Sequence, residues 1–313
     1  MPFTAKSGKF NASINAVEFG TGDKAVKIGG ENVFPLYSFD AAIENAPKVG
    51  IEITDFGMEH EPECIKKYYE GCCYSGRYAR KAASMEGVDF LSFRMEGGDP
   101  NGANKSTEEL IGELKEIADA VDLPLVVCGC KNVEKDAELF SKAAEALNGK
   151  NAVILSAKEE NYKTVGAAAG LAYKQVVGAE SAVDINLAKQ LNVLISQLGV
   201  DSKSVVMNVG TAAVGYGFEY VISTMDRVKA AALQQGDANL QMPIITPVAS
   251  EAWGVKEAMA SETDAPEWGS QEERGIDMEV ETAMAVIAAG SNAVILKHPE
   301  SIKIISGLMK ELV

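Results

Sequence analysis

Residues 88–128 contain two short apolar runs, Val88-Asp-Phe-Leu-Ser-Phe93 and Pro124-Leu-Val-Val-Cys128, separated by an amphipathic stretch. The stretch begins with Ser106-Thr-Glu-Glu109, which fits a helix capping box. Its apolar residues recur at the spacing of one helical face, at Leu110, Leu114, Ile117 and Val121. Short apolar runs of this kind are typical of buried parallel strands. The segment therefore predicts a strand, a helix and a second, parallel strand.

The same alternation runs along most of the 313 residues. Two further helices are expected, one with Asp184 as its N-cap and one that begins at Pro299. Eight strands are predicted, at Phe34–Phe39, Val88–Phe93, Pro124–Cys128, Ala152–Leu155, Gln175–Gly178, Ser204–Met207, Met242–Val248 and Asn292–Leu296. Eight such units indicate one α/β domain, a closed (β/α)8 TIM barrel. The stretch Ile51–Thr54 is interpreted as an extra strand or a long loop.

The N-terminal region precedes this alternation. Val17-Glu-Phe19 and Val26-Lys-Ile28 flank a polar turn at Gly20–Lys24, a pattern that favours a β-hairpin. We interpret the hairpin as a plug for the floor of the barrel. The whole chain, 1–313, is then one domain, with an N-terminal extension and hairpin at 1–32 and the barrel at 33–313.

The charge and hydropathy of the chain argue against several classes of partner and against a membrane location. The formal net charge is −16 and no Lys/Arg cluster occurs, which argues against nucleic acid or an anionic membrane as partner. No uncharged run reaches the roughly 18 residues of a membrane span, and the start of the chain has no apolar signal-peptide region. We therefore expect a cytoplasmic protein.

Cysteines and histidines are too few, or wrongly spaced, for a metal site. The five cysteines, Cys64, Cys72, Cys73, Cys128 and Cys130, do not follow an iron–sulfur spacing, and we expect them to be free thiols. The only histidines are His60 and His298. The sequence predicts neither a metal site nor a catalytic nucleophile paired with a base.

In TIM barrels the loops that follow the strands form the active face. In this chain those loops carry amides, hydroxyls and glycines in place of a known catalytic motif. The candidate binding residues are Asp99, Asn101, Ser156, Asn161, Asn208, Gly210, Thr211, Thr246 and His298.

The connection after the seventh predicted strand is unusually long. It holds both tryptophans of the chain, Trp253 and Trp268. Long loops often bind partners, and buried aromatic side chains are enriched in interfaces. We expect one of the two tryptophans to contact a partner subunit or a cofactor; the alternative is that both cap the barrel's own helices.

Several motifs, in the same order along the chain, resemble one known family. They are Gly97-Gly-Asp-Pro-Asn-Gly-Ala-Asn104, Glu159-Glu-Asn-Tyr162, Asp184-Ile-Asn-Leu-Ala-Lys-Gln-Leu-Asn192, Gly215-Tyr-Gly-Phe-Glu-Tyr220, Glu251-Ala-Trp253, Lys256-Glu-Ala258, Glu273-Arg-Gly275 and His298-Pro-Glu300. Together they resemble the small subunit of the corrinoid iron–sulfur protein, whose archaeal counterpart is the delta subunit of acetyl-CoA decarbonylase/synthase. The chain departs from that pattern at Asn208-Val209 and at Ser156-Ala-Lys-Glu159.

The resemblance implies a methyl carrier of the reductive acetyl-CoA (Wood–Ljungdahl) pathway of anaerobic carbon fixation. In that family the barrel pairs with a large subunit as a heterodimer, and the two enclose a corrinoid of the cobalamin type. The iron–sulfur cluster belongs to the large subunit. A methyltransferase supplies the methyl group from methyltetrahydrofolate, acetyl-CoA synthase receives it, and a reductive activator restores the cobalt. The small subunit is then non-catalytic.

Two other functions stay open at the level of sequence. One is a methyltetrahydrofolate-dependent corrinoid methyltransferase, in which Asp99, Asn101 and Asn208 would hydrogen-bond a pterin ring; this is the activity to expect if the chain is an enzyme. The other is an unrelated barrel lyase or aldolase, which the absence of a Schiff-base lysine at a strand end disfavours.

Overall fold

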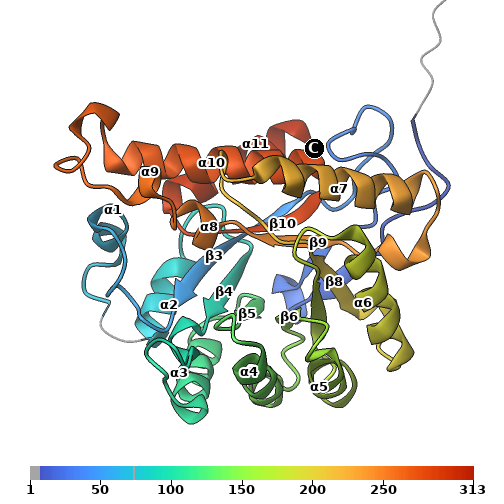
Figure 1. Cartoon of the computed structure of the whole chain (residues 1–313), viewed down its shortest axis with the longest axis horizontal. Helices are drawn as coiled ribbons and strands as arrows, with labels where there is room; N and C mark the ends of the chain where they lie inside the picture. The colour runs from blue at the N-terminus through green and yellow to red at the C-terminus, as the bar shows by residue number, and fades with distance from the viewer. Residues whose placement is uncertain (1–7, 73–74) are drawn as a thin grey trace, which may run out of the picture.

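A computed structural model describes residues 8–72 and 75–313. Eight parallel strands close into a barrel in the order β10-β3-β4-β5-β6-β7-β8-β9 (Figure 1). Their bounds are β3 Lys48–Thr54, β4 Phe90–Arg94, β5 Leu125–Cys128, β6 Val153–Ala157, β7 Val176–Glu180, β8 Val205–Asn208, β9 Ile244–Pro247 and β10 Ser291–Leu296. The predicted TIM barrel is confirmed, and seven of the eight predicted strands overlap a strand of the barrel.

The prediction of a first strand at 34–39 is wrong. This segment forms turns, Leu36 has a φ of +61°, and Phe39 is 78% exposed. The first barrel strand is β3, so the strand alternative for 51–54 is correct. Its apolar run is interrupted by Glu52, which is buried because it pairs with Arg94 of the neighbouring strand. The apolar pattern of one strand does not reveal that such a charge pairs with a residue of the neighbouring strand.

The N-terminal hairpin is confirmed and closes the floor of the barrel. Strands β1 (Val17–Phe19) and β2 (Val26–Ile28) pair antiparallel. Their buried side chains share one apolar cluster with residues that begin the barrel strands, among them Phe90 and Val153. The rings of Phe19 and Phe90 meet edge to face at 5.5 Å. The amino-terminal end of the barrel is therefore filled, and the carboxyl end is the open one.

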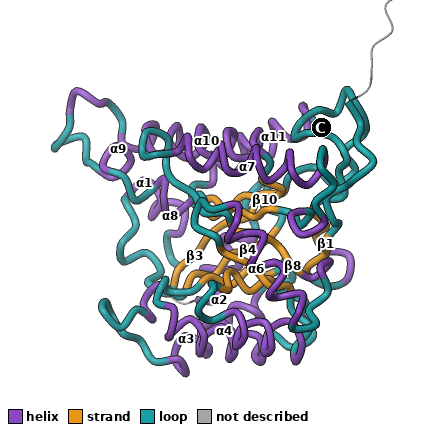
Figure 2. The backbone as a smooth tube through the Cα atoms, turned by 45° about the vertical axis from the view of Figure 1, so that its right-hand side comes forward, coloured by secondary structure: helices purple, strands orange, loops and turns teal. Residues whose placement is uncertain are grey.

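Helices surround the strands (Figure 2). The larger ones are α2 Ser75–Ala83, α3 Thr107–Ala120, α4 Val133–Ala146, α6 Ile185–Gln197, α7 Phe218–Leu233, α10 Gln271–Ala289 and α11 Pro299–Leu312. Short ones are α1 Glu63–Lys66, α5 Tyr162–Val165, which runs into a π-helical segment at Gly166–Ala172, α8 Ala249–Ala252 and α9 Lys256–Met259. The predicted caps are confirmed, since Ser106 accepts from the Glu109 N–H and Asp184 accepts from the Asn186 and Leu187 N–H groups. Among the described residues, none of the helices combines the length and the apolar character that crossing a membrane requires.

Candidate functional site

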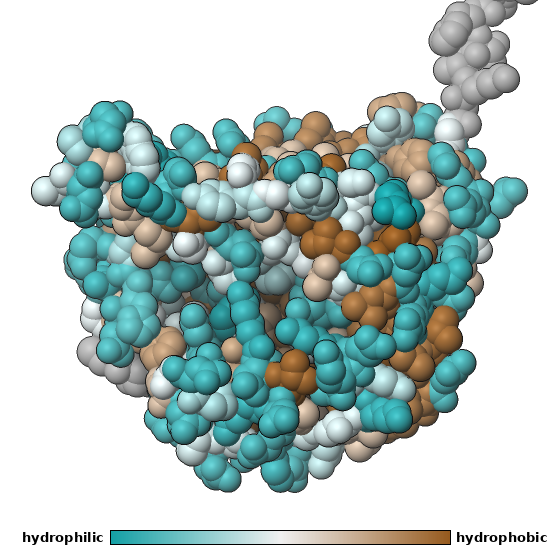
Figure 3. Space-filling view, viewed as in Figure 1, coloured by the Kyte–Doolittle hydropathy of each residue, from teal (hydrophilic) through white to brown (hydrophobic). Residues whose placement is uncertain are grey.

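A cavity of about 280 Å³ opens at the carboxyl ends of the strands. Its walls come from the ends of six consecutive strands, β4 to β9, through Arg94, Cys128, Ser156, Glu180, Asn208 and Pro247. The face shown in Figure 3 is hollowed near its centre, and most of the surface around the hollow is hydrophilic. The cavity lies where TIM barrels place their functional residues.

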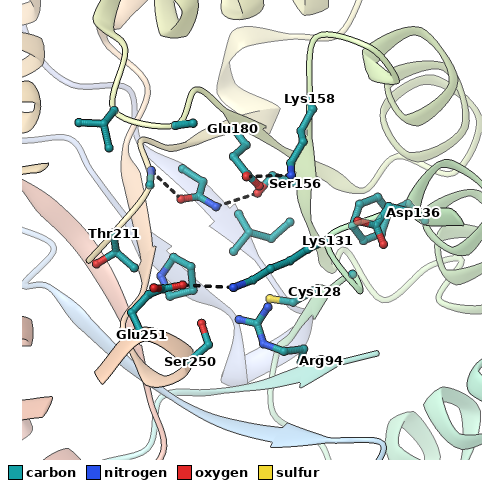
Figure 4. Close-up of a pocket in the computed structure, with 18 residues that line it drawn as sticks. Arg94, Cys128, Lys131, Asp136, Ser156, Lys158, Glu180, Thr211, Ser250 and Glu251 are labelled. Carbon is teal, nitrogen blue, oxygen red and sulfur yellow. Dashed lines mark hydrogen bonds and ion pairs between the residues drawn. The ribbon is translucent and has the colours of Figure 1, made fainter. Parts of the chain in front are cut away.

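Neutral polar side chains, among them Ser156, Thr211 and Ser250, line the cavity (Figure 4). The Asn208 side-chain amide donates to Ser156 Oγ at 3.0 Å, and both side chains are at least nine-tenths buried. Asn208 Oδ1 accepts from the Gly210 N–H at 3.1 Å, in a turn where Gly210 has a φ of +85°. The first of these hydrogen bonds joins the ends of β6 and β8 inside the cavity, and the second fixes the turn after β8.

Three ion pairs and the carboxylate of Asp136 form the charged part of the wall. Arg94 donates through Nε and Nη2 to Glu52 Oε2 at 3.0 and 2.8 Å, and both side chains are buried. Burial alone would lower the pKa of Arg94, but the charge and hydrogen bonds of Glu52 outweigh burial and raise it, so Arg94 stays protonated. The other two pairs are Lys158 with Glu180 at 3.3 Å and Lys131 with Glu251 at 3.1 Å.

The Lys131–Glu251 pair reaches across the mouth of the cavity. Lys131 follows β5 and has a φ of +69°, whereas Glu251 lies in α8, after β9. In the closed order β5 and β9 are four positions apart, on opposite sides of the eight-stranded barrel. Figure 4 shows the lysine side chain extended over the cavity toward the carboxylate.

The structure brings four of the predicted binding residues together. Ser156, Asn208, Gly210 and Thr211 all line the cavity. Asn161 also comes from this face, but its side chain is used to hold the loop after β6: Oδ1 accepts from the Lys158 N–H and Nδ2 donates to the Val133 carbonyl.

The other four predicted residues lie outside the cavity lining. Asp99 and Asn101 form a turn in the loop after β4, where the Asn101 N–H donates to Asp99 Oδ1 at 2.9 Å. Thr246 is buried in β9 and shares a hydrogen bond of 2.8 Å with Ser291. His298 is the N-cap of α11, with Nδ1 accepting from the Glu300 N–H.

His298 is the centre of a buried contact between the long connection and the last helices. Its ring stacks on Trp253 at 5.8 Å and meets Tyr68 edge to face at 5.2 Å. Nε2 lies 3.4 Å from Glu272 of α10. Burial lowers the pKa of His298 to about 4, so the ring is neutral at neutral pH.

The cavity lining also includes residues that were not predicted as binding residues, among them Cys128, Lys131, Lys158 and Glu180. Glu180 ends β7 and Lys158 directly follows β6, so the strand-end rule that found Ser156 would also have found them. Lys131 differs, because only the three-dimensional path of its loop carries it over the cavity. Of the predicted free thiols, Cys64, Cys128 and Cys130 are buried and Cys72 is partly buried; Cys73 lies outside the described residues.

Comparison with known proteins identifies a family. A family model described as CO dehydrogenase/acetyl-CoA synthase delta subunit matches residues 16–309. Acetyl-CoA decarbonylase/synthase complex subunit delta 1 of Methanosarcina thermophila is 30% identical over 94% of this chain and 67% of its own length. The complex subunit delta of Methanothermobacter thermautotrophicus is 31% identical over 95% of this chain and 75% of its own length.

Solved structures agree on the architecture. Dihydropteroate synthase from Vibrio fischeri superposes with a TM-score of 0.57 at 10% identity, over 95% of this chain and 98% of that one. Dihydropteroate synthase from Xanthomonas albilineans superposes with a TM-score of 0.56 at 11% identity, over 95% of this chain and 98% of that one. At such identities the likeness shows the barrel fold alone. The match over residues 16–309, by contrast, covers the hairpin and the barrel together, and the chain belongs to the CO dehydrogenase/acetyl-CoA synthase delta subunit family.

Proposed function

We propose that this chain is the small subunit of a heterodimeric corrinoid iron–sulfur protein, the methyl carrier of the reductive acetyl-CoA pathway. In this role it helps a large subunit to enclose the corrinoid. A methyltransferase delivers the methyl group from methyltetrahydrofolate, and acetyl-CoA synthase receives it. The observation that carries the proposal is the family match across residues 16–309, together with relatives named as subunits of a complex.

The residues of the barrel mouth fit one side of a corrinoid. A cavity of about 280 Å³ is slightly smaller than the roughly 300–1,000 Å³ of pockets for drug-sized ligands. A corrinoid is larger than such ligands, so it would lie across the mouth and be covered on its other side by a second protein. Buried amide and hydroxyl groups, such as those of Asn208 and Ser156, suit the peripheral amides of the corrin ring. The fit supports a corrinoid shared between two subunits.

The chemistry of the cavity wall suits a carrier. When bound, the corrinoid supplies the cobalt that holds the methyl group, and the protein supplies position and shielding from water. The thiol that lines the cavity is Cys128. Burial raises the pKa of Cys128, although Arg94 lies close enough to oppose this shift. At neutral pH the side chain is therefore a thiol, and no thiolate competes at this position for a reactive methyl group.

The iron–sulfur cluster is proposed for the large subunit. Within residues 8–72 and 75–313, no three or more His, Cys, Asp and Glu side chains gather as a metal-binding group. We expect the separately expressed chain to be colourless and to bind little corrinoid. Stoichiometric cobalt or iron in the purified single chain would refute this assignment of the cofactors.

No observation favours the methyltransferase alternative. Its pterin-binding set was Asp99, Asn101 and Asn208, but the first two bond to each other outside the cavity that Asn208 lines. We expect the isolated chain to transfer no methyl group from methyltetrahydrofolate to cob(I)alamin above background. The transfer is measured by the loss of cob(I)alamin absorbance. A robust rate that disappears in Asn208→Ala would establish the enzyme in place of the carrier.

A further inference from the structure

Two neutral side chains of the cavity wall, Asn208 and Ser156, keep hydrogen-bonding capacity that the fold does not use. Asn208 uses one amide proton toward Ser156 and one lone pair toward the Gly210 N–H, which leaves a second proton and a second lone pair. Ser156 accepts from Asn208 and keeps its own hydroxyl proton to donate. Both side chains are more than nine-tenths buried. A ligand placed against them meets donors and an acceptor side by side.

The charged groups around the cavity already have partners. Arg94 is bound to Glu52, Lys158 to Glu180, and Lys131 to Glu251. Asp136, the remaining carboxylate of the lining, accepts from the Cys130 N–H at 2.7 Å. An anionic ligand would have to compete with one of these carboxylates, and a cationic ligand with one of the basic groups. A neutral group that both donates and accepts hydrogen bonds leaves all three pairs intact.

Access requires only that a weak contact opens. The Lys131–Glu251 pair over the mouth has side chains that are 65% and 37% exposed. Exposed pairs of this kind contribute little to stability, so the lysine can move aside at small cost. The cavity beneath holds a side arm of a large ligand but not its body.

We propose that this cavity is a subsite for one neutral primary carboxamide arm of the corrin periphery, bound by Asn208 and Ser156. The inference rests on the proposed function and adds which part of the corrinoid this chain recognises and through which side chains. A primary carboxamide has one carbonyl acceptor and an NH₂ donor, so it pairs with the free proton of either side chain and with the free lone pair of Asn208.

The test uses the complete heterodimer of this chain and its large subunit, loaded with cobalamin. The dissociation rate of the corrinoid is measured by its absorbance after an excess of a corrinoid-capturing protein is added. Asn208→Ala and Ser156→Ala should each raise the rate about threefold to tenfold, the effect of one lost hydrogen bond. Asn186→Ala is the matched control, because Asn186 is exposed in the first turn of α6; its rate should equal that of the wild type. Thermal unfolding of each free variant shows whether it folds.

The ligand provides the second arm of the test. Cobalamins in which single carboxamide arms are hydrolysed to carboxylates are compared, one isomer at a time. One isomer should dissociate faster from the wild type, and Asn208→Ala should not accelerate that isomer further, since the contact is already lost. Equal rates for all isomers and for both cavity variants would overturn the subsite and leave the carrier role standing. Tight methyltetrahydrofolate binding that depends on Asn208 would also overturn the subsite, and a complex without corrinoid would overturn the proposed function itself.

Discussion

Trp253 and Gly275 depend on each other at the scale of single residues. Trp253 is 5% exposed, and its ring lies over Gly275 of α10, where a built Cβ would overlap the ring atoms. The Trp253 ring also stacks on the ring of His298. The glycine therefore lets the long connection after β9 pack directly on α10. This result supports, for Trp253, the alternative that the tryptophan caps the barrel's own helices.

Gly275→Ala is expected to destabilise the chain. Alanine gains about 1 kcal/mol of helix propensity, but overpacking costs about 1–3 kcal/mol and disturbs the stacked rings. Gly112→Ala is the matched control: Gly112 is exposed within α3, and a built Cβ there meets no atom within 4 Å. Chemical denaturation should show a lower midpoint for the first variant and an unchanged or higher one for the second. Equal midpoints would contradict the packing argument.

The lowered pKa of His298 makes stability depend on pH. The pKa is 6.5 for an unperturbed histidine and about 4 in the folded chain, so the unfolded chain binds the proton more readily. The contribution of His298 is complete above pH 6.5 and is lost as the pH falls toward 4. His298→Asn keeps an N-cap for α11 but cannot titrate. Melting temperatures between pH 7 and pH 4 should fall more steeply for the wild type; parallel curves would refute the assignment.

At the scale of elements, the sequence predicted most of the fold because each signal was local. The cap at Ser106 is a pattern of four consecutive residues, and the apolar face of α3 repeats every three or four residues. Both are confirmed. Strand β3 was ambiguous because Glu52 pairs with Arg94, which lies 42 residues further along the chain. The strand prediction for 34–39 was wrong for a different reason. The segment has the apolar composition of a buried strand but lies at the surface, where Tyr37 is 45% exposed.

In the candidate site too, some residues could be predicted from local sequence and others could not. Ser156, Asn208, Gly210 and Thr211 were predicted because they follow strands directly. The loop path that brings Lys131 over the cavity, and the buried contacts that give His298 an N-cap position, depend on the folded chain.

The two tryptophans of the connection between β9 and α10 differ in their exposure to solvent. Trp253 is buried, whereas Trp268 is 37% exposed, with Lys256 Nζ 5.1 Å and Arg274 Cζ 5.6 Å from the centre of its ring. Of the two tryptophans, Trp268 is thus the one available to a partner. We therefore assign the expected interface contact to Trp268.

Trp268→Ala should weaken association with the large subunit by about 1 kcal/mol or more, the size of an interface hot spot. Tryptophan emission should also fall when the complex forms, since a corrinoid absorbs in that range. Titration calorimetry and fluorescence measure the two effects, and Trp253→Ala, which should instead lower the stability of the free chain, is the comparison. Unchanged affinity in Trp268→Ala with unchanged emission on binding would remove Trp268 from the interface.

At the scale of the whole molecule, the floor of the barrel is closed by its own hairpin and the mouth is open and polar. The net charge of −16 does not favour nucleic acid or an anionic membrane as the partner that covers this mouth. A barrel with one finished end and one open end fits a subunit whose ligand is completed by another protein.

The most direct test of this account is to purify the tagged chain after coexpression with its large subunit, without oxygen, and to record the absorption spectrum and the subunit ratio. The account predicts a one-to-one complex that carries corrinoid and iron, and a colourless product when the chain is expressed alone. Purification of the chain without the large subunit, or with corrinoid bound to the single chain, would contradict it.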